Sequence, residues 1–504
     1  MDQANEAQEH EQDEGQHEEI VAGLVAQDQP GATHKPEEKK EGAGTGGATP
    51  GGVSGDVHAS TETGAQGGGT EHQPQTQQAP TQIDTAKATA NTKAWNQREN
   101  SRKKEQTARI EARVGPKKGA WTATELATCQ SNGGAMGVLI ALNERQPKQG
   151  VQILKDANKW DLLVASLPKG KLTAPAAKAV DLMVQDSVFA LADMITLFEK
   201  RFAHPALGVS SGANNAKDWT HDSMIVIWRQ LALLPASDVT LNSAIASFRA
   251  ISGGGAFGPA WDSPTVNTVD MGQDNGNHEH LEHTTRHEIG HGVHSQIQGQ
   301  VNPWLQNDMK FWYITFDEFI TDLGGFPATY TKANGSVVPM DANMKAWMSH
   351  LVKEFTGYGA WGPTKATPET GAHPDVAAAW ASMPLAIRNA CTQSKSHWYK
   401  NYENFQESGG NSYFLNHYYK KPFKFGATAK AAISATNDNY TAMSEKEFFA
   451  NCYAEYFANP AGAKIHAQWG GALPGSVKAF FKDCVVERNP YSAFQKSQAK
   501  KETA

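Results

Sequence analysis

The sequence predicts a predominantly helical α+β protein that follows a long disordered N-terminal segment. The first 20 residues carry eight carboxylates and no Lys or Arg, and residues 40–82 are mostly Gly, Thr, Gln, Ala and Pro. Such a segment buries too little apolar surface to offset the entropy that is lost on ordering. All 13 tryptophans lie from Trp95 onward, and the apolar spacings there fit helices more often than strands.

Charge and cysteine content exclude several classes of protein. The net charge of −7 belongs largely to the N-terminal segment, which argues against a nucleic-acid scaffold. The four cysteines are widely spaced and form no CxxC pair, so we expect small buried side chains rather than a disulfide framework or a thiolate zinc site. We expect neither an ordinary secretion signal nor a membrane span, because no basic-then-apolar start and no run of ~18 apolar residues occurs.

Helical signals dominate residues 95–251. A polar helix is predicted over 95–113, closed by Gly115-Pro116, and its basic side chains indicate a solvated connector. Three further helical segments are predicted, namely 173–202 with Thr173 as N-cap, 224–234 ended by Pro235, and 238–251 capped by Asp238. Residues 265–269 alternate polar and apolar side chains, as an exposed strand does.

The segment His287-Glu288-Ile289-Gly290-His291 carries the chemistry, on a helix predicted over 281–298. Residues four apart on a helix differ by about 400° in direction, so His287 and His291 project from one face and can share a metal ion. Glu288 is placed to act as general base toward an activated water without being a ligand. Gly290 and Gly292 would permit close helix packing. The nearby histidines are interpreted as surface or supporting residues: His278, His280, His283 and His294.

A catalytic zinc site needs a third protein ligand. One class of zinc peptidase has a third histidine six residues after the second, with glycine midway; this chain has Ile297 and His294 there, so that class is excluded. Glu318 lies in a helix-like stretch over 311–323 and resembles the Glu of the Glu-x-x-x-Asp helix in thermolysin-like peptidases. Glu447 lies on a helix predicted over 444–457, where a carboxylate among apolar side chains is costly unless it is paired or metal-bound. Glu455 is a further alternative.

The motif at 287–291, together with Glu447-Phe448-Phe449-Ala450, resembles the catalytic domain of anthrax-lethal-factor-type zincins and related bacterial toxin peptidases. The resemblance covers about residues 260–490, and these two motifs are its specific part. It implies that Glu447, ahead of Glu318 and Glu455, is the third zinc ligand, and that Tyr440 stabilises the oxyanion. The family often has a second Glu four residues after this ligand, whereas this chain has Asn451, so a supporting carboxylate is not expected there.

The resulting expectation is a disordered leader over 1–94, a basic connector helix over 95–118, a helical domain over 119–252, a zincin-like catalytic domain over 253–495 and a tail over 496–504. The expected activity is hydrolysis of peptide bonds with a Zn²⁺ cofactor held by His287, His291 and Glu447. The strand near 266–269 is expected to align an extended protein or peptide substrate by backbone pairing. The tryptophans expected in the core are Trp304, Trp312, Trp347 and Trp361.

The resemblance also implies a bacterial toxin or effector, secreted or injected without a signal peptide, whose leader contacts a secretion or injection apparatus. A cytoplasmic location is the alternative. Two other functions fit the same residues. One is a structural zinc or binding protein of a secretion apparatus without turnover, and the other is a zinc hydrolase that acts on a non-peptide bond, since activated water does not specify the carbonyl it attacks.

Overall fold

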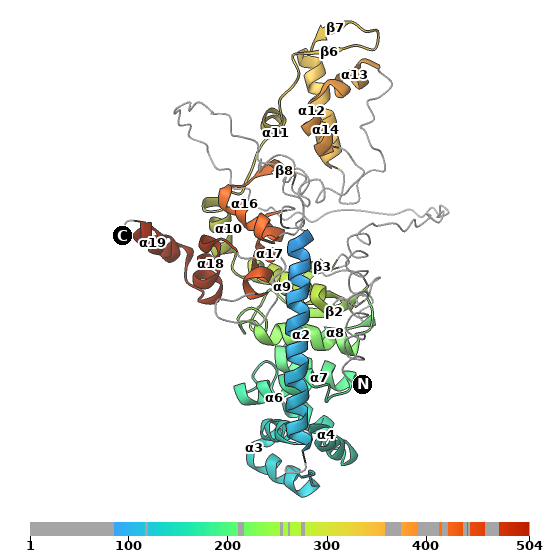
Figure 1. Cartoon of the computed structure of the whole chain (residues 1–504), viewed down its shortest axis with the longest axis vertical. Coiled ribbons are helices and arrows are strands. Elements are labelled where there is room, and N and C mark those ends of the chain that lie inside the picture. Colours follow the sequence, from blue (N-terminus) through green and yellow to red (C-terminus); the bar gives the residue numbers. More distant parts are fainter. Residues whose placement is uncertain are drawn as a thin grey trace, which may run out of the picture. The chain divides into compact units, whose positions relative to one another are not determined.

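A computed structural model of the 504-residue chain describes residues 85–115, 119–209, 216–252, 256–260, 263–273, 278–357, 374–391, 413–415, 422–436, 441, 444–458 and 473–502. All of these residues belong to the compact unit Gln75–Ala504. Of the predicted disordered leader, residues 1–84 lie outside the described part, whereas residues 85–94 belong to a helix. Helices predominate, and small sheets complete an α+β architecture, as predicted (Figure 1).

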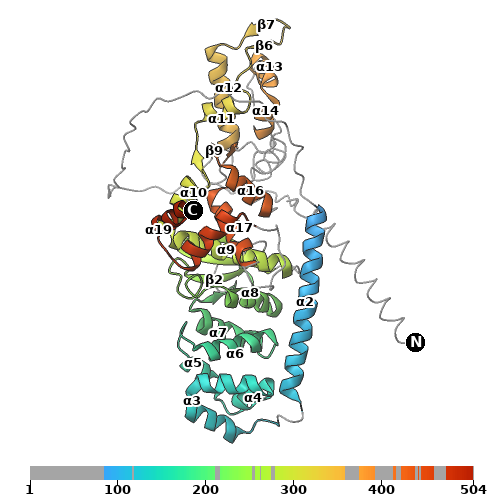
Figure 2. The ribbon, with the colours of Figure 1, turned by 60° about the vertical axis from the view of Figure 1, so that its left-hand side comes forward.

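Helices make up the first part of the described chain, and those from α3 to α8 pack on one another (Figure 2). They are α2 (Thr85–Val114), α3 (Ala123–Glu144), α4 (Pro147–Asp156), α5 (Trp160–Ser166), α6 (Ala174–Gln185), α7 (Leu191–Phe202) and α8 (His221–Leu233). The side chains of Thr122 and Thr220 cap α3 and α8 by accepting hydrogen bonds from backbone amides of the first turn. The single helix predicted over 173–202 is divided in two, because Ser187 has a φ of 52° and separates α6 from α7.

A four-stranded sheet follows, with the strand order β1-β2-β4-β3. Its strands are β1 (Ala206–Leu207), β2 (Ser247–Ile251), β3 (Ala256–Ala260) and β4 (Ser263–Gly272). β2 lies parallel to both β1 and β4, whereas β3 is antiparallel to β4. β4 therefore lies inside the sheet, and Val269 is fully buried. The prediction of an exposed strand over 265–269 is wrong, because β2 and β3 flank β4 on its two sides.

The helix predicted over 238–251 is also wrong. Residues 247–251 are all buried in β2, which pairs with β4 along its whole length. Asp238 does not cap a helix. Its buried carboxylate instead accepts hydrogen bonds from Tyr453 at 2.7 Å and from Arg488 at 2.5 Å. Tertiary contacts thus replace the local contacts that a helix would have used.

The helices after the sheet carry the aromatic part of the core. They are α9 (His278–Gln296), α10 (Gln298–Asn307), α16 (Ala427–Thr436), α17 (Glu445–Ala458), α18 (Gly475–Phe480), the π-helix η4 (Phe481–Val486) and α19 (Tyr491–Glu502). Trp304 of α10 is fully buried, as predicted, and stacks on Phe480 with ring centroids 4.1 Å apart. This core continues into that of α3–α8 across the predicted boundary at residue 252, and α19 runs through most of the predicted tail.

A second hydrophobic cluster lies in the segment between α10 and α16. The elements of this segment are β5 (Trp312–Tyr313), α11 (Phe316–Asp322), β6 (Thr329–Thr331), β7 (Val337–Pro339), α12 (Ala342–Gly357), α13 (Pro374–Ser382), α14 (Leu385–Cys391), β8 (Tyr413–Leu415) and β9 (Pro422–Lys424). The helix predicted over 311–323 is shorter than expected, because Trp312 and Tyr313 pair with β9 before Thr315 caps α11. Trp312 and Trp347 are 46% and 53% exposed, so their assignment to the core is wrong; Trp361 lies outside the described residues.

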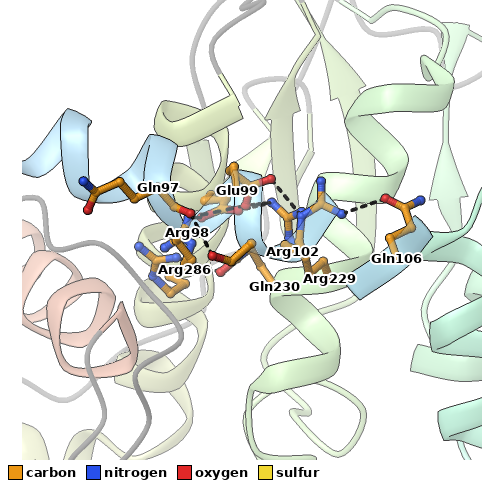
Figure 3. A network of polar contacts seen from close by, with 10 residues as sticks. Gln97, Arg98, Glu99, Arg102, Gln106, Arg229, Gln230 and Arg286 are labelled. Carbon is orange, nitrogen blue, oxygen red and sulfur yellow. Dashed lines mark hydrogen bonds and ion pairs between the residues drawn. The ribbon is translucent and has the colours of Figure 1, made fainter. Parts of the chain in front are cut away.

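The basic helix α2 is held against the other helices by ion pairs. Arg113, near its C-terminal end, binds the buried carboxylate of Asp186. Further toward its N-terminal end, Arg98 donates to Glu282 of α9 at 3.0 Å, and Glu282 also binds Arg229 of α8. Figure 3 shows how the polar side chains of α2 interleave with those of α8 and α9. The prediction of a solvated connector is therefore wrong for this side of α2, where partners neutralise the basic charges.

Candidate metal centre

The predicted metal ligands lie where α9 contacts α17, two helices that are far apart in the sequence but pack closely. In α9, Ile289 and Val293 are fully buried in the core. His287 and His291, one helical turn apart, are thereby directed to a different side of the helix, toward α17. The sequence places these two side chains correctly because their relative direction depends only on helix geometry.

A glycine permits the close approach of the two helices. A Cβ atom on Gly290 would lie 2.9 Å from the Cα of Ala450 and 3.1 Å from the Cβ of Tyr453. Carbon atoms normally pack at ~3.5–4.0 Å, so a side chain at this position would push α9 and α17 apart. The close packing predicted for the glycines of the motif is present at Gly290.

Three side-chain atoms converge at this crossing. Glu447 Oε2 lies 3.0 Å from His287 Nε2 and 3.4 Å from His291 Nε2, and the two Nε2 atoms are 3.1 Å apart. Atoms that bind a tetrahedral zinc ion at ~2.0–2.1 Å are separated from one another by about 3.3 Å. The observed separations therefore fit an ion of this size. Among the described residues, this is the group of His, Cys, Asp or Glu side chains whose ligand atoms are close enough to share a metal.

The charges of the ligands complement one another. Burial alone would raise the pKa of Glu447, but the charges and hydrogen bonds of His291 and His287 outweigh this effect and hold the pKa well below its usual range. Glu447 is therefore a carboxylate at neutral pH. Two imidazole nitrogens and one carboxylate oxygen form a donor set that is typical of catalytic zinc sites, which keep a fourth position for water.

Asn451, one turn after Glu447 on α17, supports the first histidine. Its Oδ1 atom lies 2.9 Å from His287 Nδ1, and the side chain is fully buried. A hydrogen bond from Nδ1–H to this oxygen leaves the Nε2 lone pair directed at the candidate metal position. The sequence led us to expect no carboxylate support here; the structure shows that the neutral amide oxygen occupies the supporting position.

Glu288 has the features of a proton acceptor. Its carboxylate is buried, and Oε2 has no hydrogen-bond partner within the described part of the chain. Burial raises the pKa of Glu288 to about 7; the charges of Glu447 and Asp270 add to this effect, and those of His287 and His291 oppose it. A carboxylate with a pKa near neutrality is suited to take up and release a proton.

The other predicted candidates lie elsewhere or outside the described residues. Glu318 closes a capping box with Thr315 at the start of α11 and is exposed, so the structure does not place it in the ligand group. Glu455 is buried on α17, where its charge acts on Arg286. His294 is buried and hydrogen-bonded to Asn302 at 3.1 Å. Tyr440, the predicted oxyanion donor, lies outside the described residues.

Sequence reasoning did not identify Arg286, which joins three helices next to the first ligand. From α9, its Nε donates to the carbonyl oxygen of Ala454 in α17 at 3.0 Å, and its Nη1 donates to Gln230 of α8 at 2.7 Å. Burial lowers the pKa of Arg286 to about 10, while Glu282 and Glu455 oppose this effect. An arginine within the apolar pattern of a predicted helix is the signal that would have marked it, since a buried charge requires partners.

The comparisons with known proteins found no match. No family model, no curated protein and no solved structure matches it. None of the helices in the described ranges combines the length and hydropathy that a membrane crossing requires. The similarity to zincins therefore remains a resemblance of two short motifs.

Proposed function

We propose that this chain is a zinc-dependent endopeptidase of the zincin type. The observation that carries the proposal is the triangle of His287, His291 and Glu447, with separations of 3.0–3.4 Å, next to the buried carboxylate of Glu288. His287 and Glu447 are buried, and His291 is partly exposed. A structural zinc site does not require an adjacent carboxylate with an oxygen that no donor of the described residues contacts, whereas a hydrolytic site requires a proton acceptor there.

The proposed roles follow from the positions of the side chains. When bound, zinc supplies Lewis acidity, which lowers the pKa of water toward ~7 and polarises a carbonyl group. His287, His291 and Glu447 hold the ion. Glu288 takes up the proton of the attacking water and passes it to the departing amine of the cleaved peptide bond. Tyr440 enters the proposal through the resemblance alone, as the donor to the oxyanion, a contribution of ~2.7–4 kcal/mol for one donor.

We assign the alignment of the substrate to β3 and not to β4, the strand for which the sequence predicted this role. Because β4 lies inside the sheet, its backbone groups pair with β2 and β3 and are not available to a substrate. β3 is the last strand in the order β1-β2-β4-β3 and lies near α9. An extended peptide that adds to a sheet edge gains backbone hydrogen bonds without depending on its sequence. The assignment as a bacterial toxin or effector, with a leader that contacts a secretion apparatus, rests on the motif resemblance.

The test combines zinc content with cleavage of an unbiased peptide library by the full chain. We expect Glu288→Gln to retain zinc and lose cleavage, and Glu447→Ala to lose zinc. Glu318→Gln is the matched control, because Glu318 is the rival third ligand; we expect it to keep both properties. Cleavage by Glu288→Gln at the wild-type rate would contradict the mechanism.

The same measurements, extended with a panel of ester substrates, separate the two alternatives. A wild-type protein that holds stoichiometric zinc but cleaves no peptide and no ester is a structural or binding protein. Cleavage confined to a panel of esters indicates a zinc hydrolase that acts on a non-peptide bond. A wild-type protein without zinc would overturn the proposal as a whole.

A further inference from the structure

One buried amide oxygen lies within hydrogen-bond distance of two histidine rings. Asn451 Oδ1 lies 2.9 Å from Nδ1 of His287 and 3.1 Å from Nε2 of His283. All three side chains are buried, with Asn451 fully enclosed. His283 stands one turn before His287 on α9, and the two ring centroids are 6.0 Å apart. The proposed zinc site gives no role to His283.

The orientation of this amide decides which nitrogen of His287 carries the proton. With Oδ1 toward the rings, His287 donates from Nδ1–H and its Nε2 presents a lone pair to the metal position. With the amide reversed, the NH₂ group would donate to Nδ1, and the proton would move to Nε2. His287 would then donate toward Glu447 and could not bind a metal through that nitrogen.

His283 distinguishes the two orientations. When His283 carries its proton on Nε2, it donates to the same oxygen, so reversing the amide would place an N–H donor against an N–H donor. Asn451 Nδ2 has no hydrogen-bond partner among the described residues, and so offers no anchor of its own for the amide. The two ring nitrogens on the oxygen side are therefore the contacts that orient the group.

We propose that His283 is a positioning residue that holds the Asn451 amide with its oxygen toward His287 and thereby keeps His287 Nε2 available as a metal ligand. This inference rests on the metal site of the proposed function. His283 touches neither the metal position nor the substrate and acts through Asn451. Residues that orient metal ligands in this way typically contribute 10–100-fold to metal affinity.

The experiment measures Zn²⁺ affinity of the full chain by competition with a chelator, and the visible absorption of the Co²⁺-loaded protein. His283→Phe keeps a planar ring without a donor, and we expect 10–100-fold weaker Zn²⁺ binding. His283→Gln restores an N–H near the position of Nε2, and we expect affinity close to that of wild type. The Co²⁺ spectrum should change with His283→Phe and return with His283→Gln.

A double-mutant cycle with Asn451→Asp identifies the route of the effect. A carboxylate has two equivalent oxygens, so its orientation needs no partner. We expect His283→Phe to cost little affinity in the Asn451→Asp background. Equal losses in both backgrounds would overturn the inference, as would wild-type affinity in His283→Phe alone or a failure of His283→Gln to restore binding.

Controls separate a loss of folding from a loss of orientation. Thermal unfolding of each metal-free variant measures general destabilisation. A variant that is only destabilised should lose the same Zn²⁺ affinity in the Asn451→Asp background as in the wild-type background. If His283→Phe does not fold, His283→Leu takes its place in the same cycle. If the wild type binds no Zn²⁺ or Co²⁺, the proposed function fails together with this inference; if it binds and the cycle shows no coupling, only this inference fails.

Discussion

Replacing Gly290 with Ala tests how far the metal centre depends on the close approach of α9 and α17. The added Cβ would lie 2.9 Å from the Cα of Ala450 and 3.2 Å from its carbonyl oxygen, both of them backbone atoms. Since carbon atoms pack at ~3.5–4.0 Å, the helices must separate by about 0.5–1 Å. Metal–ligand distances tolerate deviations of only ~0.2 Å, so this movement takes Glu447 out of reach of a metal held by the two histidines.

The expected effect on stability is small beside the effect on metal binding. Alanine gains up to ~1 kcal/mol of helix propensity over glycine, while overpacking typically costs ~1–3 kcal/mol. We expect the free energy of unfolding of the metal-free Gly290→Ala protein to fall by about 0–2 kcal/mol. Zn²⁺ affinity should fall at least about tenfold, which corresponds to ~1.4 kcal/mol. Denaturant titration and chelator competition measure the two quantities separately.

Gly292→Ala is the matched control on the same helix. Its Cβ would meet the Cγ1 and Cδ1 atoms of Ile245 at 3.0 and 3.2 Å and the Nδ2 atom of Asn242 at 3.3 Å, all of them side-chain atoms that can shift. We expect Gly292→Ala to bind Zn²⁺ like the wild type. Wild-type affinity in Gly290→Ala, or an equal loss of affinity in Gly292→Ala, would show that the metal centre does not depend on the close approach at Gly290.

Three further predictions concern stability. Burial lowers the pKa of His294 from 6.5 to about 4, so the folded state binds fewer protons than the unfolded state in this range and stability falls as the pH drops from 6.5 to 4. At pH 5 this loss amounts to about 2 kcal/mol relative to pH 7, and His294→Gln should remove it in denaturant titrations at the two pH values. Glu282→Gln removes the closer of the two buried carboxylates that pair with Arg229, the other being Glu99, and should cost ~3–5 kcal/mol of unfolding free energy; an unchanged value would show that α2 is not held by this network. Trp304→Ala, at a fully buried site, should cost ~3–5 kcal/mol, whereas Trp347→Ala, at a site 53% exposed, should change stability by less than ~0.5 kcal/mol in the same assay.

Elements with a strong local signal are predicted well from the sequence. The helices expected over 281–298 and 444–457 appear as α9 and α17, with ends within three residues of those expected. Both carry repeated apolar positions at helical spacing, and this spacing acts over neighbouring turns of the same segment. The same helix geometry explains why the side chains of His287 and His291 project from one side of α9.

Elements that depend on distant partners are predicted poorly. Residues 247–251 have a spacing that fits a helix, yet they form β2 because β1 and β4 supply hydrogen-bonding partners from elsewhere in the chain. The basic side chains of α2 suggest solvation when they are considered alone. They are instead paired, because acidic residues such as Asp186 and Glu282 lie on helices that pack against α2.

The sequence by itself determined the helical character of the chain and the pairing of His287 with His291, because both follow from a repeat of about four residues along one segment. The motif resemblance named Glu447, but the tertiary structure alone decided whether and how it meets the two histidines. The packing of α9 against α17 at Gly290 brings Glu447 Oε2 to 3.0 Å from His287 Nε2 and places Asn451 on the other ring nitrogen. Two helices far apart in sequence reach this distance because their buried faces share one core, and no local pattern encodes the distance between them.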